Sequence, residues 1–267
     1  MGYYFIDYHT HTEMSNDNEQ TLLHLCESAM NKDVKEICIT EHIDFLESSF
    51  CYNKFSFSEQ EKRIAEVSPL FPDLKIKIGV EIDYQREFFL QICDFIMLHD
   101  FDYIIGSCHR VDGVPAAFCD DYFIGKTDKE AYIRYFQTVK EAICTNMFTT
   151  IGHFDWIKRH GCRFYGLFDI NIAKDIISEC LEEMIKRDMT MEVSSAGLRQ
   201  RPREMYPNIE ILKLYKEIGG ENVTFASDSH APSQTSIFNK EIYDILKEIG
   251  FDKISIFNKK VKSFVLI

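Results

Sequence analysis

The sequence predicts an α/β protein with a single domain: a closed or nearly closed barrel of seven strands with helices between them. Apolar runs with strand character alternate with stretches of helical periodicity along the chain. Histidines and carboxylates lie at or just past the ends of six of the strand-like runs, one group per run. The length of 267 residues suits one barrel, because β/α barrels commonly contain about 250 residues.

Seven apolar runs are predicted to be strands: residues 4–8, 36–40, 76–80, 103–106, 149–152, 190–193 and 223–227. Five stretches with one apolar helical face are predicted to be helices: residues 19–32, 58–67, 87–99, 128–147 and 170–188. Ser58 and Glu61 form a capping-box pattern at the start of the second helix. Residues 44–57 and 110–127 are expected to be loops over the mouth of the site, and a last strand at 253–257 precedes an apolar tail.

The alternation of strands and helices favours parallel pairing through right-handed crossovers. An open doubly wound sheet is the alternative architecture. It would gather ligands at one switch point rather than at six strand ends. The predicted domain covers residues 1–267.

Charge and composition exclude several classes of protein. The net charge is −13, from 30 basic and 43 acidic residues, which argues against non-specific binding of nucleic acid. No run of 18 apolar residues occurs, and the start lacks a basic segment before an apolar core, so we expect neither a membrane span nor a signal peptide. Nine cysteines without a CxxC pair favour reduced thiols. We therefore expect a cytoplasmic protein.

Nine side chains at the predicted strand ends have the chemistry of metal ligands. They are His9, His11, Glu41, His42, Glu81, His109, His153, Asp228 and His230. Imidazole and carboxylate groups bind divalent transition metals, and a β/α barrel builds its active site where the strands end. The sequence therefore predicts a metalloenzyme.

Six motifs resemble those of the polymerase and histidinol phosphatase (PHP) family: DYHTHT at 7–12, ITEH at 39–42, GVE at 79–81, GSCH at 106–109, IGH at 151–153 and ASDSH at 226–230. They stand in the family's order over nearly the whole chain. The resemblance implies a distorted (β/α)7 barrel that holds two to three divalent ions, which are zinc, manganese or iron.

The resemblance also implies how the ligands divide among three ions. The first ion would be held by His9, His11, Glu81 and Asp228. The second would be held by Glu81, as a bridge, with His109 and His153. The third would be held by Asp17, His42 and His230. The family often has a histidine where this chain has Asp17, so Asp17 is either a harder oxygen ligand or a solvated carboxylate ahead of a helix.

Two arginines and two further carboxylates complete the predicted site. Arg159 and Arg199 fall on the ligand-bearing rim, where a guanidinium fork matches phosphate oxygens; a surface salt bridge is the alternative for each. Glu192 is expected to orient a ligand histidine, to meet a cationic substrate or to have a structural role. Asp7 is expected to support the ligands.

The resemblance implies hydrolysis of a small phosphate monoester, with L-histidinol phosphate, an intermediate of histidine biosynthesis, as the expected substrate. Glu81 would bridge two ions that activate a water, while Arg159 and Arg199 bind the phosphoryl group. Asp228, His230 or a metal-bound water would protonate the leaving oxygen. The alternatives are a PHP-type phosphoesterase for another monoester or nucleotide, an amidohydrolase-type hydrolase, and a non-catalytic interaction domain stabilised by metal.

Overall fold

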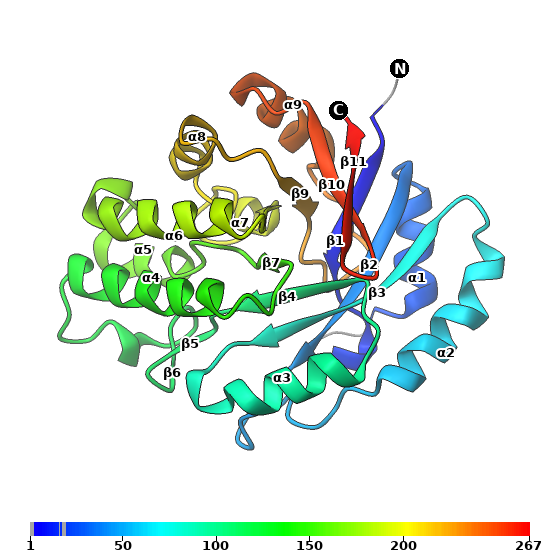
Figure 1. Cartoon of the computed structure of the whole chain (residues 1–267), viewed down its shortest axis with the longest axis horizontal. Helices are drawn as coiled ribbons and strands as arrows, with labels where there is room; N and C mark the ends of the chain where they lie inside the picture. The colour runs from blue at the N-terminus through cyan, green and yellow to red at the C-terminus, as the bar shows by residue number, and fades with distance from the viewer. Residues whose placement is uncertain (1–2, 16, 18–19) are drawn as a thin grey trace.

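A computed structural model describes residues 3–15, 17 and 20–267 of the chain. Seven parallel strands lie at its centre: β1 (Phe5–Thr10), β2 (Val34–Ile43), β3 (Lys75–Asp83), β4 (Tyr103–Ser107), β7 (Thr150–Ile151), β8 (Thr190–Ser194) and β9 (Val223–Ala226). They are hydrogen-bonded in the order β1-β2-β3-β4-β7-β8-β9 (Figure 1). The two edge strands meet beyond their C-terminal ends, where the Asp228 amide donates to the His9 carbonyl at 2.8 Å. The predicted barrel of seven strands, nearly closed, is confirmed.

Helices surround the barrel, as Figure 1 shows. They are α1 (Leu22–Met30), α2 (Phe57–Val67), α3 (Phe89–Leu98), α4 (Asp128–Cys144), α5 (Lys158–Tyr165), α6 (Lys174–Lys186), α7 (Ala196–Arg199), α8 (Ile209–Glu217) and α9 (Asn239–Ile249). Residue 19, where the first helix was predicted to begin, lies outside the described residues. Within the described part of the chain, no helix combines the length and apolar character that crossing a membrane requires.

The start of α2 differs from the prediction. The capping box predicted at Ser58 and Glu61 is wrong by two residues, because the side chain of Ser56 caps the helix and accepts from the Glu59 amide. Phe57 is then the first helical residue, and its ring packs against Phe101 with centroids 5.1 Å apart. This aromatic contact lies outside the helix itself, so the local sequence pattern does not contain it.

The predicted loop at 110–127 contains a small hairpin. Strands β5 (Arg110–Val111) and β6 (Val114–Pro115) pair antiparallel, and the turn between them is formed by Asp112 and Gly113. Both turn residues have positive φ, 52° and 77°, as two-residue hairpin turns require. The Asp-Gly dipeptide is a recognised signal for such a turn, so this hairpin could have been predicted.

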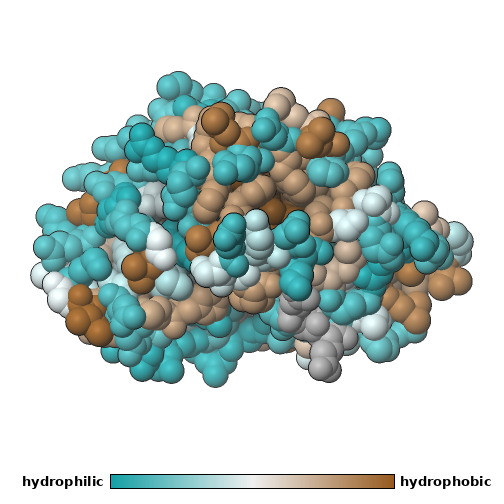
Figure 2. Space-filling model, turned by 90° about the horizontal axis from the view of Figure 1, so that it is seen from below, coloured by the Kyte–Doolittle hydropathy of each residue, from teal (hydrophilic) through white to brown (hydrophobic). Residues whose placement is uncertain are grey.

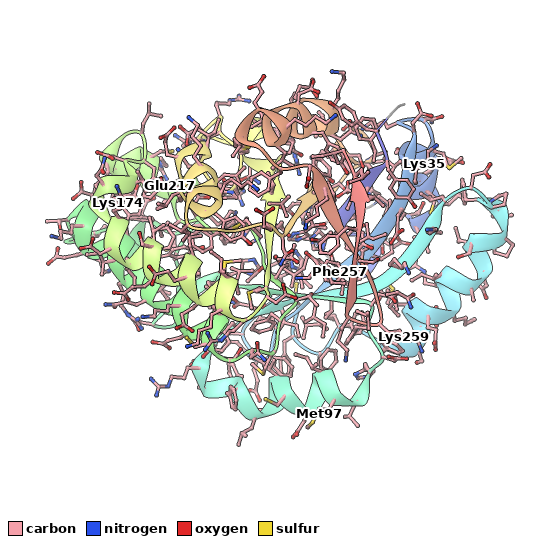
Figure 3. All side chains as sticks on the ribbon, turned by 45° about the horizontal axis from the view of Figure 1, so that its top comes forward. Lys35, Met97, Lys174, Glu217, Phe257 and Lys259 are labelled. Carbon is pink, nitrogen blue, oxygen red and sulfur yellow. The ribbon has the colours of Figure 1, made fainter. Side chains whose placement is uncertain are left out.

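The C-terminal segment forms a second hairpin against the barrel. Strand β10 (Lys253–Asn258), where a strand was predicted, pairs antiparallel with β11 (Val261–Leu266), which forms the apolar tail. The Phe257 amide donates to the Tyr8 hydroxyl at 2.8 Å, and the Phe257 ring lies 4.9 Å from that of Tyr103 at the start of β4. Figure 3 shows Phe257 near the middle of the molecule. The hairpin thus covers the barrel near the beginnings of the strands, away from the predicted ligands.

A buried lysine joins α5 to the segment that follows α7. The ammonium group of Lys158, whose side chain is 1% exposed, lies 2.8 Å from both the Asp155 carboxylate and the Met205 carbonyl. Asp155 also accepts from the Asn208 amide at 2.8 Å. Close packing reaches Gly197 as well, where a Cβ atom would lie 1.9 Å from the Glu204 carbonyl oxygen. These contacts fix the segment that carries Arg199 against the helix that carries Arg159.

Lys158→Met is expected to lower the free energy of unfolding by about 3–5 kcal/mol, because it leaves the buried Asp155 carboxylate without its cation. Urea denaturation followed by circular dichroism measures the change. Lys213→Met is the control, since the Lys213 side chain is 55% exposed and pairs with Glu210 on the surface. Equal stability changes in the two variants would contradict a structural role for the buried pair.

Candidate metal centre

The carboxylate of Glu81, at the C-terminal end of β3, lies at the centre of the predicted ligands. Its side chain is 1% exposed. The Oε2 atom is 2.8 Å from His42 Nδ1, 3.2 Å from His9 Nε2 and 3.5 Å from His11 Nε2. These histidines end the neighbouring strands β1 and β2, so the parallel register brings them to the same edge of the barrel.

The second carboxylate oxygen of Glu81 faces a different pair of histidines. Its Oε1 atom is 3.0 Å from His153 Nε2 and 3.3 Å from His109 Nε2, and it accepts a hydrogen bond from the Ser107 hydroxyl. The two histidines follow β4 and β7, and Ser107 is the last residue of β4. The two oxygens of one carboxylate therefore point toward separate sets of nitrogen ligands, which is the arrangement that a bridge between two ions needs.

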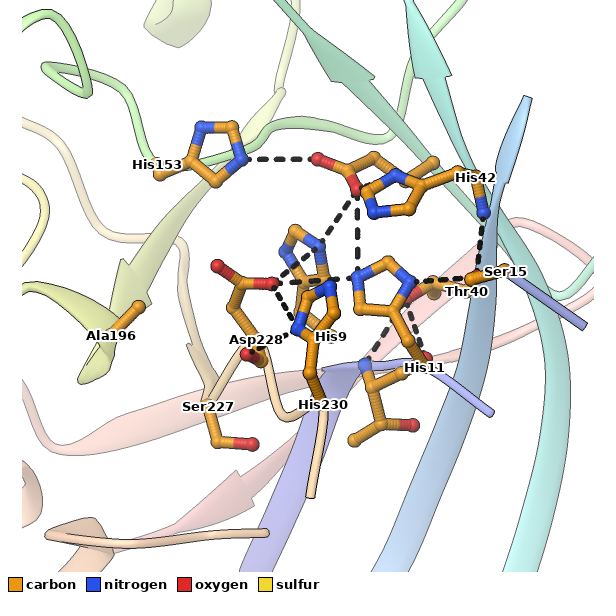
Figure 4. A network of polar contacts seen from close by, with 12 residues as sticks. His9, His11, Ser15, Thr40, His42, His153, Ala196, Ser227, Asp228 and His230 are labelled. Carbon is orange, nitrogen blue, oxygen red and sulfur yellow. Dashed lines mark hydrogen bonds and ion pairs between the residues drawn. The ribbon is translucent and has the colours of Figure 1, made fainter. Parts of the chain in front are cut away.

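Two aspartates complete the cluster on the side of β1 and β9. Asp228 Oδ1 lies 3.4 Å from His11 Nε2 and 3.8 Å from His9 Nε2. Asp17 Oδ2 lies 3.2 Å from His42 Nε2 and 3.0 Å from His230 Nε2. All nine side chains of the predicted ligand set thus lie around one space, and Figure 4 shows the labelled imidazoles converging there.

The ligand atoms form three compact groups, in each of which they lie within 4.8 Å of one another. The groups are His9, His11 and Asp228; His9, Glu81 and His153; and His11, His42 and His230. They overlap with the division into three ions that the resemblance implies, although His9 and His11 each occur in two groups. The assignment of each ligand to a particular ion stays a prediction.

The donor atoms of this cluster fit divalent ions. His9 Nε2 and His11 Nε2, which face the carboxylates of Glu81 and Asp228, are buried and have no hydrogen-bond partner among the described residues. Burial and the nearby imidazoles of His42 and His230 lower the pKa of His11 to about 3, so its ring is neutral and can donate a lone pair to a metal. Buried polar atoms without partners are costly, and metal ions bound there would remove that cost.

Burial alone would raise the pKa of Glu81, but the neighbouring rings of His9, His42 and His109 hold it well below the ordinary value. The pKa of Asp228 is likewise held low against the effect of its burial, by His11 and His9. Both carboxylates are therefore anionic in the folded protein. Anionic carboxylate oxygens together with imidazole nitrogens form the donor set that zinc, manganese and iron accept.

Glu192 on β8 orients two of the predicted ligands. Its Oε2 atom lies 2.9 Å from His9 Nδ1, and its Oε1 atom accepts from the His153 amide at 2.7 Å. The hydrogen bond at Nδ1 leaves Nε2 of His9 as the atom available to a metal. Since Glu192 is fully buried, the orienting role is supported over contact with a substrate.

Glu41 also lies at a predicted strand end, but the family resemblance does not assign it to any of the three ions. It is fully buried and accepts from the Thr12 amide at 3.1 Å and from the Ser15 hydroxyl. The Ser15 hydroxyl lies 3.2 Å from His11 Nδ1, so Glu41 positions His11 through Ser15. Burial raises the pKa of Glu41 to about 7. Its sequence signal is a carboxylate that directly follows the run at 36–40 and precedes the predicted ligand His42.

Two predicted ligands have a backbone conformation that is uncommon for residues other than glycine. The φ angles are 30° at His153 and 51° at Asp228. Hydrogen bonds hold both: the His153 amide donates to Glu192, and the Asp228 amide donates to the His9 carbonyl. Asp7 adds support, because its carboxylate accepts from the Ser227 amide at 2.8 Å. Residues held in such conformations are frequent at functional sites.

A cavity of about 630 Å³ opens over the cluster. Asp17, His42, His109, His153, Asp228 and His230 of the cluster line it, together with Arg159 and Arg199. The Arg159 guanidinium lies 4.7 Å from the centroid of the Phe118 ring and 5.6 Å from that of Trp156. In the described part of the chain, no carboxylate lies within ion-pair distance of Arg159, so the surface salt bridge considered for it is absent. The space-filling view shows a hollow near the middle of one face, where apolar and hydrophilic side chains meet (Figure 2).

Arg199 follows β8 and is held by hydrogen bonds to the segment that follows β9. Its guanidinium donates to the carbonyls of Ser227, at 2.7 Å, and Asp228. Two backbone bonds leave part of the guanidinium for a ligand, because the group has five N–H donors. The weaker candidate Arg110 also lines the cavity, but it is paired with Asp44 and Asp83.

Known proteins resemble the chain over almost its whole length. A family model described as PHP domain matches residues 7–196. The histidinol-phosphatase of Lactococcus lactis is 24% identical over 255 residues, which cover 95% of this chain and 94% of that protein. A probable histidinol-phosphatase of Clostridium acetobutylicum is 27% identical over 257 residues, which cover 92% and 96%.

Solved structures match the fold. The histidinol phosphate phosphatase from Lactococcus lactis, complexed with zinc, L-histidinol and phosphate, gives a TM-score of 0.89 at 23% identity and covers 97% of this chain and 99% of that chain. A putative histidinol phosphatase from Listeria monocytogenes gives 0.76 at 21% identity, with 88% and 99% covered. The predicted (β/α)7 barrel is confirmed by this likeness, while the extent of the domain, residues 1–267, stays a prediction.

Proposed function

This chain belongs to the PHP domain family, as its motifs predicted, and from this premise we propose that it is a metal-dependent phosphatase whose substrate is L-histidinol phosphate. The observation that carries the proposal is a cluster of nine convergent metal-type side chains, six of which line one cavity together with two arginines. The nearly full-length likeness to histidinol-phosphatases supports the substrate. Nine free cysteines support an enzyme of the cytoplasm, where it would act in histidine biosynthesis.

The nine side chains would hold two to three divalent ions: zinc, manganese or iron. Bound ions of this kind act as Lewis acids on phosphoryl oxygens and make a water acidic enough to attack near neutral pH. Glu81 would bridge, because its two oxygens face different histidines. Glu192 and Glu41 would keep His9 and His11 in their required orientations.

Arg159 and Arg199 would bind the phosphoryl group. Each guanidinium is immobilised before substrate arrives: Arg159 by the rings of Phe118 and Trp156, Arg199 by the carbonyls after β9. Immobilised donors stabilise the charge on the phosphoryl oxygens without further ordering cost. His230 lines the same cavity and would deliver the proton that the leaving oxygen requires, since the anionic carboxylate of Asp228 has none to give.

The arginine assignment predicts a kinetic effect. Arg159→Ala and Arg199→Ala should keep the metal content of the wild type but lower kcat/KM for phosphate monoesters by on the order of 10²-fold, the loss of a charge-assisted phosphate contact. Steady-state kinetics and metal analysis of the same preparations measure both quantities. Arg187→Ala is the control, since Arg187, the C-cap of α6, pairs with Glu183 and does not line the cavity. Wild-type kinetics in both arginine variants would contradict the assignment.

The substrate is tested by comparing purified, metal-loaded protein on L-histidinol phosphate, generic monoesters and nucleoside monophosphates. A preference of about 10-fold or more in kcat/KM for L-histidinol phosphate is expected, equivalent to about 1.4 kcal/mol. Faster turnover of a nucleotide or sugar phosphate would leave the metal centre standing and reject this substrate.

A further inference from the structure

The cavity has two walls of opposite charge. The strand order places β2, β3 and β4 side by side, and the residues that follow or end these strands include Asp44, Asp83 and Arg110. The other half of the barrel, from β7 to β9, supplies Arg159 and Arg199. All five residues line the cavity. We call the first set the acidic wall, and it is the part of the cavity for which the proposed chemistry has no use.

The acidic wall carries one negative charge in excess. The Arg110 Nη1 atom donates to Asp44 Oδ2 at 2.9 Å and to Asp83 Oδ2 at 2.8 Å, so two carboxylates share one guanidinium. Their side chains are 7% and 2% exposed, and that of Arg110 is 15% exposed. His109 Nδ1 lies 3.7 Å from Asp83, but a histidine that ligates a metal is neutral. Because these side chains have little contact with water, their excess negative charge is weakly screened. It therefore favours a cation in the cavity.

Asp44 is the carboxylate that can receive this cation. Asp83 already accepts from the His109 amide at 2.8 Å, from Arg110 and from Gln85 at 3.2 Å. The Oδ1 atom of Asp44 has only two long contacts, at 3.4 Å to the Leu46 amide and 3.4 Å to the Gln85 side chain, among the described residues. Contacts of that length are weak hydrogen bonds, so Oδ1 retains most of its capacity as an acceptor.

We propose that Asp44 binds a cationic group on the leaving alcohol and thereby selects esters that carry a positive charge opposite their phosphate. This inference rests on the proposed function and assigns the specificity of the same site. The substrate would lie between the walls, with its phosphoryl group at Arg159 and Arg199 and its ammonium group at Asp44. An ester without the cation leaves the nearly buried Asp44 carboxylate without a charged partner. The free-energy cost of that unpaired carboxylate disfavours the neutral ester.

Two esters of equal length test this inference: 2-aminoethyl phosphate, whose leaving alcohol is a cation, and 2-hydroxyethyl phosphate, whose leaving alcohol is neutral. The measured quantity is the ratio of their kcat/KM values with metal-loaded enzyme. Wild type is expected to favour the aminoethyl ester by about 10-fold or more. Asp44→Asn should reduce the ratio at least about fivefold, because it removes the charge but keeps the size. The balanced pair of Asp83 and Arg110 remains, so the variant should fold.

Two further variants define the outcome. Asp44→Glu keeps the charge and should retain a preference for the aminoethyl ester. Asp112→Asn changes an aspartate that is 62% exposed and paired with Arg134 outside the cavity, and it should leave the ratio as in wild type. Should Asp44→Asn not fold, Asp44→Ser takes its place in the comparison.

The results separate this inference from the function on which it rests. Wild type that hydrolyses neither these esters nor L-histidinol phosphate would reject the proposed function. Wild type that hydrolyses them without preference, or an Asp44→Asn variant with an unchanged ratio, would overturn the role of Asp44 and leave the phosphatase standing. Equal losses on both esters in Asp44→Asn would also overturn it, because they indicate a purely structural carboxylate.

Discussion

Glu81→Ala is expected to lose more than one ion's worth of bound metal and to lower kcat/KM by on the order of 10³-fold or more. Both carboxylate oxygens of Glu81 face histidines, Oε2 toward His9, His11 and His42, and Oε1 toward the other two. If Glu81 bridges two ions as proposed, a single truncation would remove a donor from both. Metal analysis by mass spectrometry, with kinetics on the same preparation, measures the two losses.

Glu36→Ala provides a matched control for Glu81→Ala. Glu36 is also a buried strand carboxylate at 1% exposure, but it bonds to the Tyr8 hydroxyl near the C-terminal hairpin, away from the ligands. Its removal should cost stability while the metal content stays that of wild type. If Glu81→Ala retains the full metal content, the bridging role is wrong, whatever the activity of the variant.

The position of the ligands could be predicted because it depends on local patterns. His9, Glu81 and His153 each follow an apolar run, and parallel strands connected by helices bring such positions to one edge of a barrel. The net charge and the length of the chain carry no information about where these side chains lie. Strand ends carry the information because the side-chain period of two fixes which residues face the barrel interior.

Contacts between distant segments could not be predicted in the same way. Asp44, Asp83 and Arg110 come from three different strand ends, and their mutual pairing appears only once the strand order is known. The orienting role of Glu192 required the packing of β8 beside β7. The route from Glu41 to His11 likewise passes through Ser15, which lies outside any strand. Each is a tertiary contact without a local pattern.

Two further differences between the prediction and the structure concern a hairpin turn and a helix cap, both of which have local sequence signals. The Asp112-Gly113 turn is a local hairpin signal inside a segment that was predicted to be loop. The cap of α2 is Ser56 rather than Ser58, and Phe57, the first helical residue, packs against the ring of Phe101. Local patterns therefore determined which elements exist, whereas packing determined where they begin.

Removal of metal is expected to abolish phosphatase activity completely and to lower the stability of the fold. The buried His9 Nε2 and His11 Nε2 atoms have no hydrogen-bond partner among the described residues, so without ions the folded protein keeps their desolvation cost. Ions that bind only the folded state stabilise it by RT ln(1 + [M]/Kd), about 2.7 kcal/mol at 100 times Kd. Dialysis against a chelator, followed by thermal unfolding and kinetics, measures both effects.

Reconstitution of the chelated protein makes this prediction specific. Zinc, manganese or iron should restore activity and raise the unfolding temperature in parallel, because the donor set of imidazoles and carboxylates suits these ions. Calcium should restore neither, since it requires six to eight oxygen ligands and the cluster offers mostly nitrogen.

Asp17→Ala should need more metal for full activity than wild type, as Asp17 bridges only His42 and His230 at the edge of the cluster. A chelated, metal-free protein with undiminished activity would contradict the whole metal centre, because Arg159 and Arg199 can hold a phosphoryl group but cannot make a water acidic enough to attack it.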